Sequence, residues 1–384
     1  MNFCKMNGAG NDFIIIDNRE AGMNESELSA LAAHLCERRM SIGADGLIAV
    51  ETARGSGDFR MRFFNADGSR AEMCGNGARC ICRYGYENGL AGAVQRVETD
   101  AGIVVGKKIS GREYRVLMNR PSVMELDKEI TVWDVQSGCN RVYRCDYVEL
   151  GEPGVPHAVL EYNGLSRIVT YAGAHTADQK EVDSETNGGL VFRPENDEGI
   201  LQLREIGRAV RKSPCFPKGA NVNFYEFMDD GRVLEMTFER GVEDFTYACG
   251  SGSASVAAVL AVRGRIGVCG SEDAEMEKDI ALSPRGEAYA IRLLMRGGEL
   301  GVRIELADEA EVQDAKAAVI KNAEMKKCEG TGAGKWQRAE VRSAQATAHG
   351  CAALIERVYL SGPTNMVACG VITDDELHDF INKR

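Results

Sequence analysis

The chain has 384 residues, of which 44% are hydrophobic and 27% are charged. These are the proportions of an ordinary globular protein with room for about two domains. A net charge of −12 argues against nucleic acid or an anionic membrane surface as a partner, and no run of about 18 apolar residues predicts a membrane span.

The thirteen cysteines are scattered along the chain and odd in number. The opening residues, Met1 to Met6, lack the basic segment and the apolar run of a secretory signal. We therefore expect a cytoplasmic protein whose cysteines are free thiols.

The first part of the chain predicts short strands around two helices. One amphipathic helix begins near Asn24 and carries Leu28, Leu31 and Leu35 on one stripe. A second, short helix is expected over residues 80–86. Strands are expected over residues 13–17, 47–50, 61–64, 97–99, 103–105 and 114–118.

The pattern starts again near Pro121. A helix is expected over residues 201–210, with Leu201, Ile206 and Val210 on one side, and a buried helix over residues 253–262. Strands are expected over residues 142–150, 158–160, 223–227, 233–238, 288–294, 300–304, 358–360 and 366–368.

One construction occurs twice: a strand, a polar loop, a Cys-Gly pair and a helix. The first copy contains Cys74 and the second contains Cys249. A helix N-terminus is where a thiol ionises most easily and where a carboxylate is most easily held. The two copies indicate related halves that bring two thiols to one cleft.

Two facing thiols suit the inversion of an amino acid at its α-carbon. A thiolate removes the proton from one face, and a thiol supplies a proton to the other. Amides at the two helix N-termini, those of Gly75, Asn76, Gly250 and Ser251, would stabilise the carboxylate as negative charge builds on it.

These residues also carry a resemblance. Asn65-x-Asp67-Gly68-Ser69, followed by Cys74-Gly75-Asn76-Gly77-x-Arg79, resembles the signature of the diaminopimelate epimerase family. Further motifs in the family's order are Lys5 to Phe13, Gly43 to Leu47, Pro156-His157, Asn221-x-Asn223-Phe224 and Glu239 to Val242. The resemblance covers about residues 1–305 and again about 357–371.

The resemblance implies an α/β (α+β) fold with two pseudo-symmetric domains, each a curved, mostly antiparallel sheet around a central helix. The N-terminal domain would comprise residues 1–120 and 356–384, and the C-terminal domain residues 121–306. Residues 307–355 have no counterpart in the family. We expect a helical insertion there, either a surface hairpin or an oligomer contact or regulatory arm.

The activity implied is that of a cofactor-independent two-cysteine epimerase, which needs neither metal nor pyridoxal phosphate. It would convert LL-2,6-diaminopimelate to the meso form in lysine and peptidoglycan precursor synthesis, as a homodimer. Cys74 and Cys249 would be the catalytic pair.

The resemblance also assigns supporting roles. Glu239 and Arg240 would hold the distal amino and carboxylate groups of the substrate, because an arginine fork meets a carboxylate with two bonds. His157 and Glu239 would adjust the ionisation of the cysteines. Additional hydrogen bonds around the distal end would come from Asn11, Asn65 and Asn221. On residue type alone, asparagines in Gly-rich loops are more often turn formers.

Departures from the family pattern leave the substrate open. Val155 stands where the family often has Asn, and Gly46 where some members have a substrate-facing Gln. Ser251 and Ser253 replace the usual Thr and Ala. A racemase of another amino acid, such as histidine, is therefore an alternative. An alternative of another class is a non-catalytic redox sensor or metal binder that uses the same two cysteines.

Overall fold

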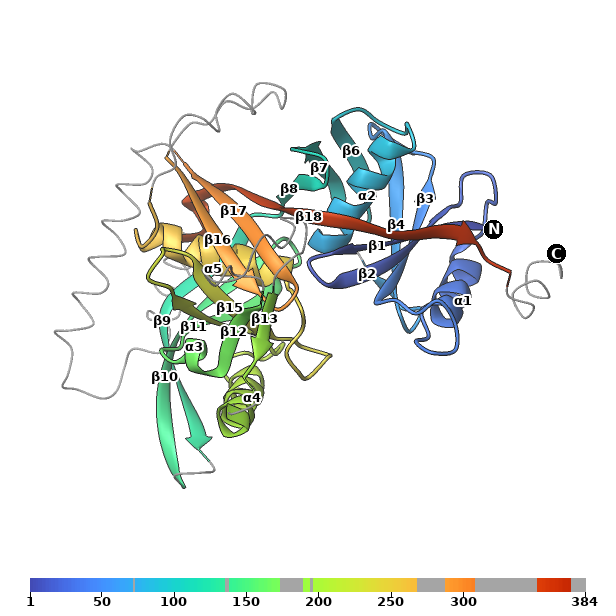
Figure 1. The fold of residues 1–384 in the computed structure, drawn as a ribbon. Coiled ribbons are helices and arrows are strands. Elements are labelled where there is room, and N and C mark those ends of the chain that lie inside the picture. The colour runs from blue at the N-terminus through green and yellow to red at the C-terminus, as the bar shows by residue number, and fades with distance from the viewer. Residues whose placement is uncertain are drawn as a thin grey trace, which may run out of the picture. The chain divides into compact units, whose positions relative to one another are not determined.

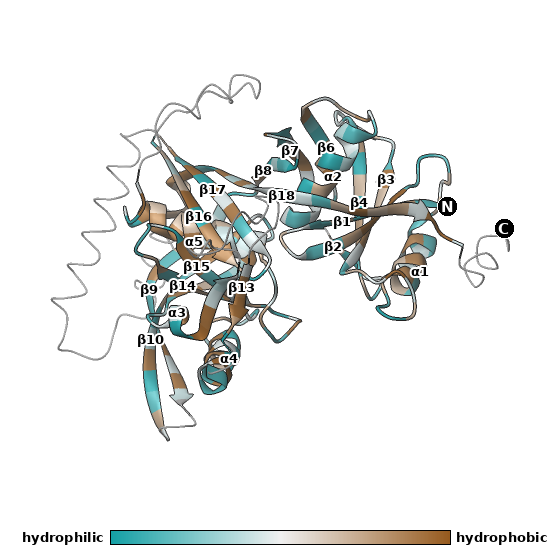
Figure 2. Ribbon diagram, in the orientation of Figure 1, coloured by the Kyte–Doolittle hydropathy of each residue, from teal (hydrophilic) through white to brown (hydrophobic). Residues whose placement is uncertain are grey.

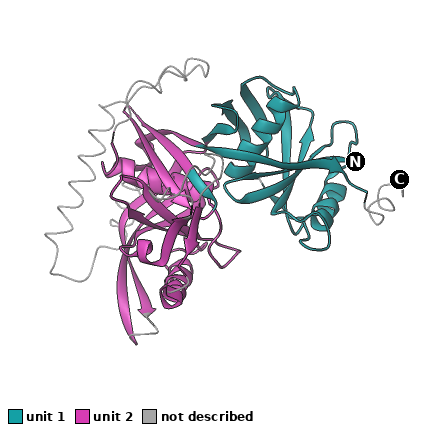
Figure 3. Ribbon diagram, in the orientation of Figure 1, with its two compact units in different colours: residues 1–117, 297–299, 361–384 teal, residues 118–296, 300–360 magenta. Residues whose placement is uncertain are grey.

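The structure, a computed structural model, describes residues 1–71, 73–134, 138–172, 189–193, 196–267, 287–307 and 351–373. Most of the expected helical insertion at 307–355 lies outside these residues. The chain forms two compact units (Figure 3). Unit 1 comprises residues 1–117, 297–299 and 361–384, and unit 2 comprises residues 118–296 and 300–360.

Unit 1 is built from a sheet that closes on itself. Its elements in chain order are β1 (Asn2–Gly8), β2 (Asn11–Asp17), α1 (Glu25–Leu35), β3 (Gly46–Glu51), β4 (Phe59–Asn65), β5 (Arg70–Ala71), α2 (Gly75–Glu87), β6 (Val94–Thr99), β7 (Gly102–Lys108), β8 (Glu113–Met118) and the later part of β18 (Ile355–Val371). The strand order is β1-β2-β3-β4-β6-β7-β8-β18, and β18 pairs back with β1. This additional pairing makes the sheet barrel-like.

Helix α1 forms where the sequence predicts it. The side chain of Asn24 accepts a hydrogen bond from the amide of Glu27, and the Glu27 carboxylate accepts one from the amide of Asn24. This capping box satisfies two amides that a helix start leaves without intrahelical partners. Leu28, Leu31 and Leu35 are buried, which confirms the expected stripe.

Unit 2 is built on a related plan. Its elements are β9 (Pro121–Asp134), β10 (Cys139–Leu150), β11 (Val155–Glu161), α3 (Leu165–Ile168), β12 (Val169–Ala172), β13 (Gly189–Phe192), α4 (Asp197–Arg211), β14 (Asn221–Phe227), β15 (Val233–Phe238), α5 (Gly250–Val262), β16 (Ala288–Met295), β17 (Gly298–Leu306) and the first part of β18. The strand order is β18-β17-β16-β15-β14-β11-β10-β9, and β12 and β13 form a separate pair (Figure 1).

The two units share a pattern of parallel pairs and crossover helices. In unit 1 the parallel strand pairs are β2 with β3 and β4 with β6, and in unit 2 they are β11 with β14 and β15 with β16. Parallel neighbours need a crossover connection, which a helix usually supplies. The crossover helices are α1 and α2 in unit 1 and α4 and α5 in unit 2. The sheet-dominated fold with two related halves, as predicted, is thereby confirmed.

The second crossover helix of each unit is its central helix. Helix α2 contacts β1, β2 and β7, and it buries most of its residues, including Cys80, Ile81 and Cys82. Helix α5 contacts β10, β11, β14 and β16; its residues from Val256 onward are all apolar, and almost the whole helix is buried (Figure 2). A helix without a polar face is stable only when it is enclosed on all sides.

Within the described residues, no helix combines the length and apolarity of a membrane span.

Two expectations about individual elements need correction, and one strand was missed. The two strands expected at 358–360 and 366–368 are one strand, β18, of 17 residues. Leu201 of α4 is 57% exposed, whereas Ile200 and Leu203 are buried, so the apolar face is rotated from the one expected. Strand β1 was not expected from the sequence; it is paired on both edges, with β2 and with β18.

The expectation that every cysteine is a free thiol is wrong for one pair. Cys4 of β1 and Cys369 of β18 form a disulfide, although 365 residues separate them in the sequence. Antiparallel pairing of β1 with β18 places the two residues directly opposite each other, with Cα atoms 4.1 Å apart. Sequence spacing alone cannot reveal such a pair.

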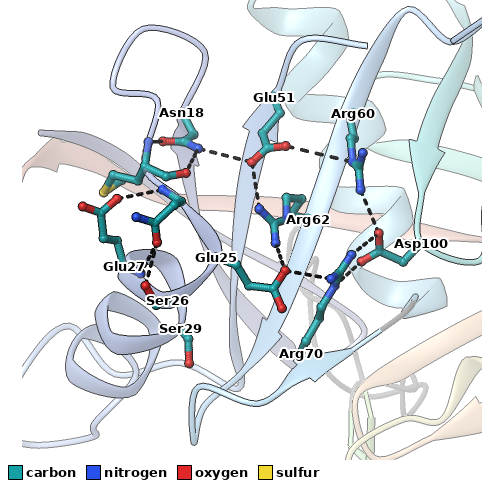
Figure 4. A network of polar contacts seen from close by, with 12 residues as sticks. Asn18, Glu25, Ser26, Glu27, Ser29, Glu51, Arg60, Arg62, Arg70 and Asp100 are labelled. Carbon is teal, nitrogen blue, oxygen red and sulfur yellow. Dashed lines mark hydrogen bonds and ion pairs between the residues drawn. The ribbon is translucent and has the colours of Figure 1, made fainter. Parts of the chain in front are cut away.

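A polar network fixes the hairpin that precedes Cys74 (Figure 4). Glu25 of α1 accepts hydrogen bonds from Arg62 at 2.7 Å and from Arg70 at 2.8 Å. Arg70 also reaches Asp100, which in turn binds Arg60 at 2.9 Å. Such networks limit side-chain freedom more than isolated surface pairs do. The network therefore links β4 and β5 to α1. Its member on β5, Arg70, lies four residues before Cys74.

Candidate active site

Cys74 occupies the N-cap position of α2. Its backbone is extended, with φ −133° and ψ 124°, and its side chain is half-buried. The preceding β4–β5 hairpin is closed by Asn65, whose amide and side-chain nitrogen donate to the backbone and hydroxyl oxygens of Ser69 at 2.8 and 2.9 Å. Asn65 is exposed and acts as a turn residue in this structure.

Two residues expected to bind substrate lie against each other in unit 1. The side chain of Asn76, in the first turn of α2, donates to the side-chain oxygen of Asn11 at 2.5 Å. The side-chain nitrogen of Asn11, at the start of β2, donates to Asp45 at 3.2 Å. Both polar ends of Asn11 are thus engaged, and the residue holds the first turn of the helix that Cys74 begins.

Arg79 is a buried cation within the same helix. Its guanidinium is fully enclosed and donates to the side-chain oxygen of Asn76 at 2.9 Å and to the carbonyl of Gly75 at 3.4 Å. Burial lowers its pKa to about 10, and the thiols of Cys80 and Cys74 act in the opposite direction when they are ionised. Among the described residues, no carboxylate forms an ion pair with Arg79. From the sequence, Arg79 was expected only as a member of the motif Cys74 to Arg79.

Cys249 occupies the N-cap position of α5 and is 8% exposed. Its Sγ accepts from the amide of Gly252 at 3.4 Å and lies 3.4 Å from Oγ of Ser251. Burial raises the pKa of this thiol, and the charge of Glu239 raises it further, whereas the contacts with Ser251 and Gly252 lower it. At Cys249 the desolvation outweighs the helix amides, so the pKa of this thiol is raised overall.

His157 belongs to a buried hydrogen-bonded chain in unit 2. The side chain of Asn223 donates to Nδ1 of His157 at 3.2 Å and to the carbonyl of Ala158 at 3.2 Å, and it accepts from the hydroxyl of Thr237 at 2.9 Å. Burial, with a smaller effect of the Arg240 charge, lowers the pKa of His157 to about 3. His157 is therefore a neutral side chain at physiological pH.

The loop after β15 brings three more expected residues together. The amide of Arg240 donates to the side-chain oxygen of Asn221 at 2.8 Å, and its guanidinium donates to the carbonyl of Lys218 at 3.0 Å. Glu239 is half-buried, and its amide donates to the carbonyl of Asp244. Asn221 thus fixes the loop, and the exposed Arg240 side chain lies beside the start of β14.

Comparison with known families decides where the chain belongs. The family described as "Diaminopimelate epimerase" matches residues 3–124 and 186–310. The chain belongs to the diaminopimelate epimerase family. Its curated relatives include one from Caldanaerobacter subterraneus, 35% identical over 276 residues that cover 69% of this chain and 85% of the relative. Another, from Archaeoglobus fulgidus, is 35% identical and covers 70% of this chain and 84% of the relative. Both are named diaminopimelate epimerase, so the protein is an epimerase, a type of isomerase.

Solved structures support the fold. A probable proline racemase from Agrobacterium radiobacter K84 has a TM-score of 0.55 at 16% identity and covers 99% of this chain and 95% of its own. A hydroxyproline epimerase from Agrobacterium vitis has a TM-score of 0.54 at 18% identity, with coverage of 98% and 94%. At these identities the likeness extends to the fold alone.

Glu235 is a buried acid in this family member that the sequence analysis missed. It is 2% exposed, and its Oε2 lies 2.6 Å from the hydroxyl of Ser253 in α5. Burial raises its pKa to about 8, although the Ser253 and Thr237 hydroxyls oppose the shift. The available signal was a lone charge within the apolar run Val233 to Phe238, every member of which is buried.

The structure shows the surroundings of two positions, Gly46 and Val155, at which the chain departs from the epimerase pattern. A Cβ atom at Gly46 would lie 2.5 Å from the Phe63 ring and 2.6 Å from the carbonyl of Phe64, so this backbone has no room for the Gln of other members. Val155, at the start of β11, is 40% exposed.

Across the described ranges, no group of three or more His, Cys, Asp or Glu residues is arranged to hold a metal ion.

Proposed function

We propose that this epimerase converts LL-2,6-diaminopimelate to meso-diaminopimelate, for lysine and peptidoglycan precursor synthesis, with Cys74 and Cys249 as its acid–base pair. The observation that carries the proposal is the repeated placement of a cysteine at the N-cap of a central crossover helix, once in each unit. The names of the curated relatives support the substrate. The chemistry requires neither a metal nor pyridoxal phosphate, and we expect a homodimer.

In the proposed reaction one cysteine removes the α-proton as a thiolate, and the bonding electron pair stays on the α-carbon. The other cysteine then protonates that carbon from the opposite face. Because burial raises the pKa of Cys249, this residue suits the role of resting thiol, and Cys74, near the Arg79 charge, suits the role of resting thiolate. The two roles exchange in the reverse direction.

Stabilisation of the intermediate is assigned to backbone amides. The first amides of a helix have no intrahelical acceptor, and they point toward its N-terminal end. We assign the amides of Gly75, Asn76, Gly250 and Ser251 to the substrate's α-carboxylate, where negative charge accumulates when the proton leaves. Preorganised donors of this kind contribute more than solvent water because they need no reorientation.

Recognition of the distal end is assigned to side chains. Arg240 would bind the distal carboxylate, and Glu239 the distal ammonium group, because their charges match these groups. Asn11, Asn65 and Asn221 would complete the binding set. His157 would influence the cysteines as a neutral group, because its pKa lies at about 3.

The test is deuterium uptake from solvent at the α-carbon, measured by NMR over a panel of amino acids. We expect rapid uptake with LL-diaminopimelate, and no uptake in Cys74→Ala and Cys249→Ala. Cys215→Ala is the matched control, because Cys215 is exposed and lies outside the proposed site. Exchange in both variants at the parent rate would refute the two-cysteine mechanism and favour a thiol sensor.

A second candidate is a racemase of another amino acid on the same scaffold. The exposed Val155 favours it, because an apolar side chain stands where the family often places a recognition amide. The same panel separates the two candidates. Uptake with histidine or another monocarboxylic amino acid, and none with diaminopimelate, would establish the racemase.

A further inference from the structure

The carboxyl group of Glu235 lies beneath the first turn of α5. Its Oε2 is 2.6 Å from Oγ of Ser253, and the same Oγ is 3.1 Å from the carbonyl oxygen of Cys249. Within the described part of the chain, Oε1 has no hydrogen-bond partner. An unpaired oxygen in a fully buried carboxylate has lost its hydration without gaining a partner, so this site disfavours the charged form.

The number of protons available around Ser253 also favours the protonated form of Glu235. A hydroxyl group has one proton to donate, yet Ser253 lies within bonding distance of two oxygen acceptors. If Glu235 is protonated, it donates to Ser253, and Ser253 donates to the carbonyl of Cys249. If Glu235 is ionised, Ser253 must donate to the carboxylate, and the Cys249 carbonyl loses that bond.

The surrounding packing leaves little freedom for another arrangement. A Cβ atom at Gly252, within the same helical turn, would lie 2.2 Å from Oδ1 of Asn223 and 3.0 Å from Oγ1 of Thr237. The buried polar groups of β14 and β15 therefore press directly against the turn that carries Cys249. A change in their hydrogen bonding is transmitted to this turn, because close-packed interiors transmit displacement.

We propose that Glu235 is a positioning residue for Cys249, acting through Ser253. The protonated acid allows Ser253 to hold the Cys249 carbonyl, whereas the ionised acid withdraws that bond and places a negative charge near the thiol. Ionisation of Glu235 therefore suppresses the Cys249 thiolate. The inference rests on the proposed function, in which Cys249 is one of the two catalytic thiols.

The other titratable groups around the Glu235 carboxyl do not change protonation state near neutral pH. His157 on β11 has a pKa of about 3, and burial raises the pKa of Tyr225, which pairs with Glu235 from β14, to about 12. Glu239, after β15, acts on Cys249 in the same direction as Glu235. On the side of β16, the adjacent ladder positions are the apolar Leu293 and Leu294. Glu235 is therefore the group whose charge changes near pH 8.

The experiment measures alkylation of Cys249 by iodoacetamide in the full chain, followed by peptide mass spectrometry between pH 6 and pH 10. Glu235→Gln mimics the protonated acid, because its amide donates to Ser253 and carries no charge. We expect equal rates for parent and variant at pH 6. At pH 9.5 we expect the variant to react at least about threefold faster, which corresponds to a shift of about half a pKa unit.

Cys74 in unit 1 is the internal control, and its rates are expected to be the same in both proteins. Superimposable Cys249 curves in folded parent and variant would overturn the proposal. If Glu235→Gln fails to fold, infrared spectroscopy of the parent decides: a buried carboxylic-acid band must disappear as pH rises through about 8, and its absence at pH 6 would overturn the proposal. Neither readout needs substrate, so absent deuterium exchange would refute the proposed function alone.

Discussion

The side chain of Asn76 donates a 2.5 Å hydrogen bond to the side chain of Asn11, 65 residues earlier in the chain. Asn76 also accepts from the buried Arg79, and Asn11 also donates to Asp45. The first turn of α2 is therefore anchored to β2 and to the loop before β3. This anchoring gives Asn11 a role in holding the Cys74 turn that does not depend on contact with substrate.

Replacement of Asn11 by Ala tests this anchor. The variant leaves the Asn76 amide without its acceptor, and we expect the free energy of unfolding to fall by about 1–3 kcal/mol. The rate of α-proton exchange should fall with it, because the Cys74 turn loses its support. Urea denaturation and deuterium uptake are the measurements.

Asn88→Ala is the matched control for Asn11→Ala, because Asn88 caps the other end of the same helix and donates to the carbonyl of Tyr84. We expect it to lose about 1 kcal/mol of stability and to keep its exchange rate. Equal losses of exchange in both variants would show that α2 stability, and not the anchor, governs activity.

Arg79 is expected to promote ionisation of Cys74. No carboxylate among the described residues pairs with this buried cation, and such a cation favours a nearby thiolate because the interior screens charge weakly. In Arg79→Met we expect Cys74 to be alkylated about three- to tenfold more slowly at pH 7.5. Arg79→Lys keeps the positive charge and should retain more of the parent rate. Unchanged alkylation in Arg79→Met would show that the guanidinium is purely structural.

Gly252 is expected to tolerate no side chain. In Gly252→Ala the new methyl group would lie 2.2 Å from Oδ1 of Asn223, so either the helix or the buried polar chain must shift. We expect a loss of about 1–3 kcal/mol in stability, as in other overpacked cores, with slower α-proton exchange. Gly267→Ala is the control, because no atom of the described ranges lies within 4 Å of a Cβ there. Equal stability of the two variants by urea denaturation would contradict the packing argument.

His157 is expected to destabilise the protein in acid. Its pKa is about 3 in the folded chain and about 6.5 when it is exposed, so the unfolded chain binds the extra proton between these values. The stability that neutral His157 contributes is therefore complete above pH 6.5 and is lost as pH falls toward 3. The measurement is urea denaturation of the parent at several pH values in this range.

His157→Gln should reduce the loss of stability below pH 6.5. The amide oxygen of Gln can still accept from Asn223, and the Gln side chain has no basic nitrogen. Glu235 acts with the opposite sign: its raised pKa removes stability as pH increases from about 4.5 to about 8. The difference between the parent and His157→Gln curves isolates the histidine. A difference that does not change between pH 7 and pH 4 would show that His157 is protonated in the folded chain.

Local sequence patterns were sufficient for much of the fold. The capping box at Asn24, the leucine stripe of α1 and the apolar run of α5 each depend on residues within a few positions of one another. The repeated strand, loop, cysteine and helix also lies within a short stretch in each unit. These features predicted the central helices and the cysteines at their N-caps, because helix starts and strand runs are set by neighbouring residues.

Contacts between distant parts of the chain lay beyond such patterns. The partner of Asn11 lies 65 residues away, and that of Cys4 lies 365 residues away. Local sequence could not reveal that the pKa of Cys249 is raised, because burial depends on the strands packed around α5. Glu235 was overlooked for the same reason, since an acid in a strand has a solvated or a buried carboxyl according to what covers it.

By itself, the sequence determined the order of most strands and of helices α1, α2, α4 and α5, the family, and the two cysteines at helix starts, because short-range periodicity and motif residues encode them. Only the tertiary structure decided which polar groups are buried, which asparagines bond to each other, and which acids and bases keep unusual protonation states. The physical reason is that hydrogen bonding and desolvation depend on neighbours in space, and strand pairing supplies those neighbours from remote positions in the chain.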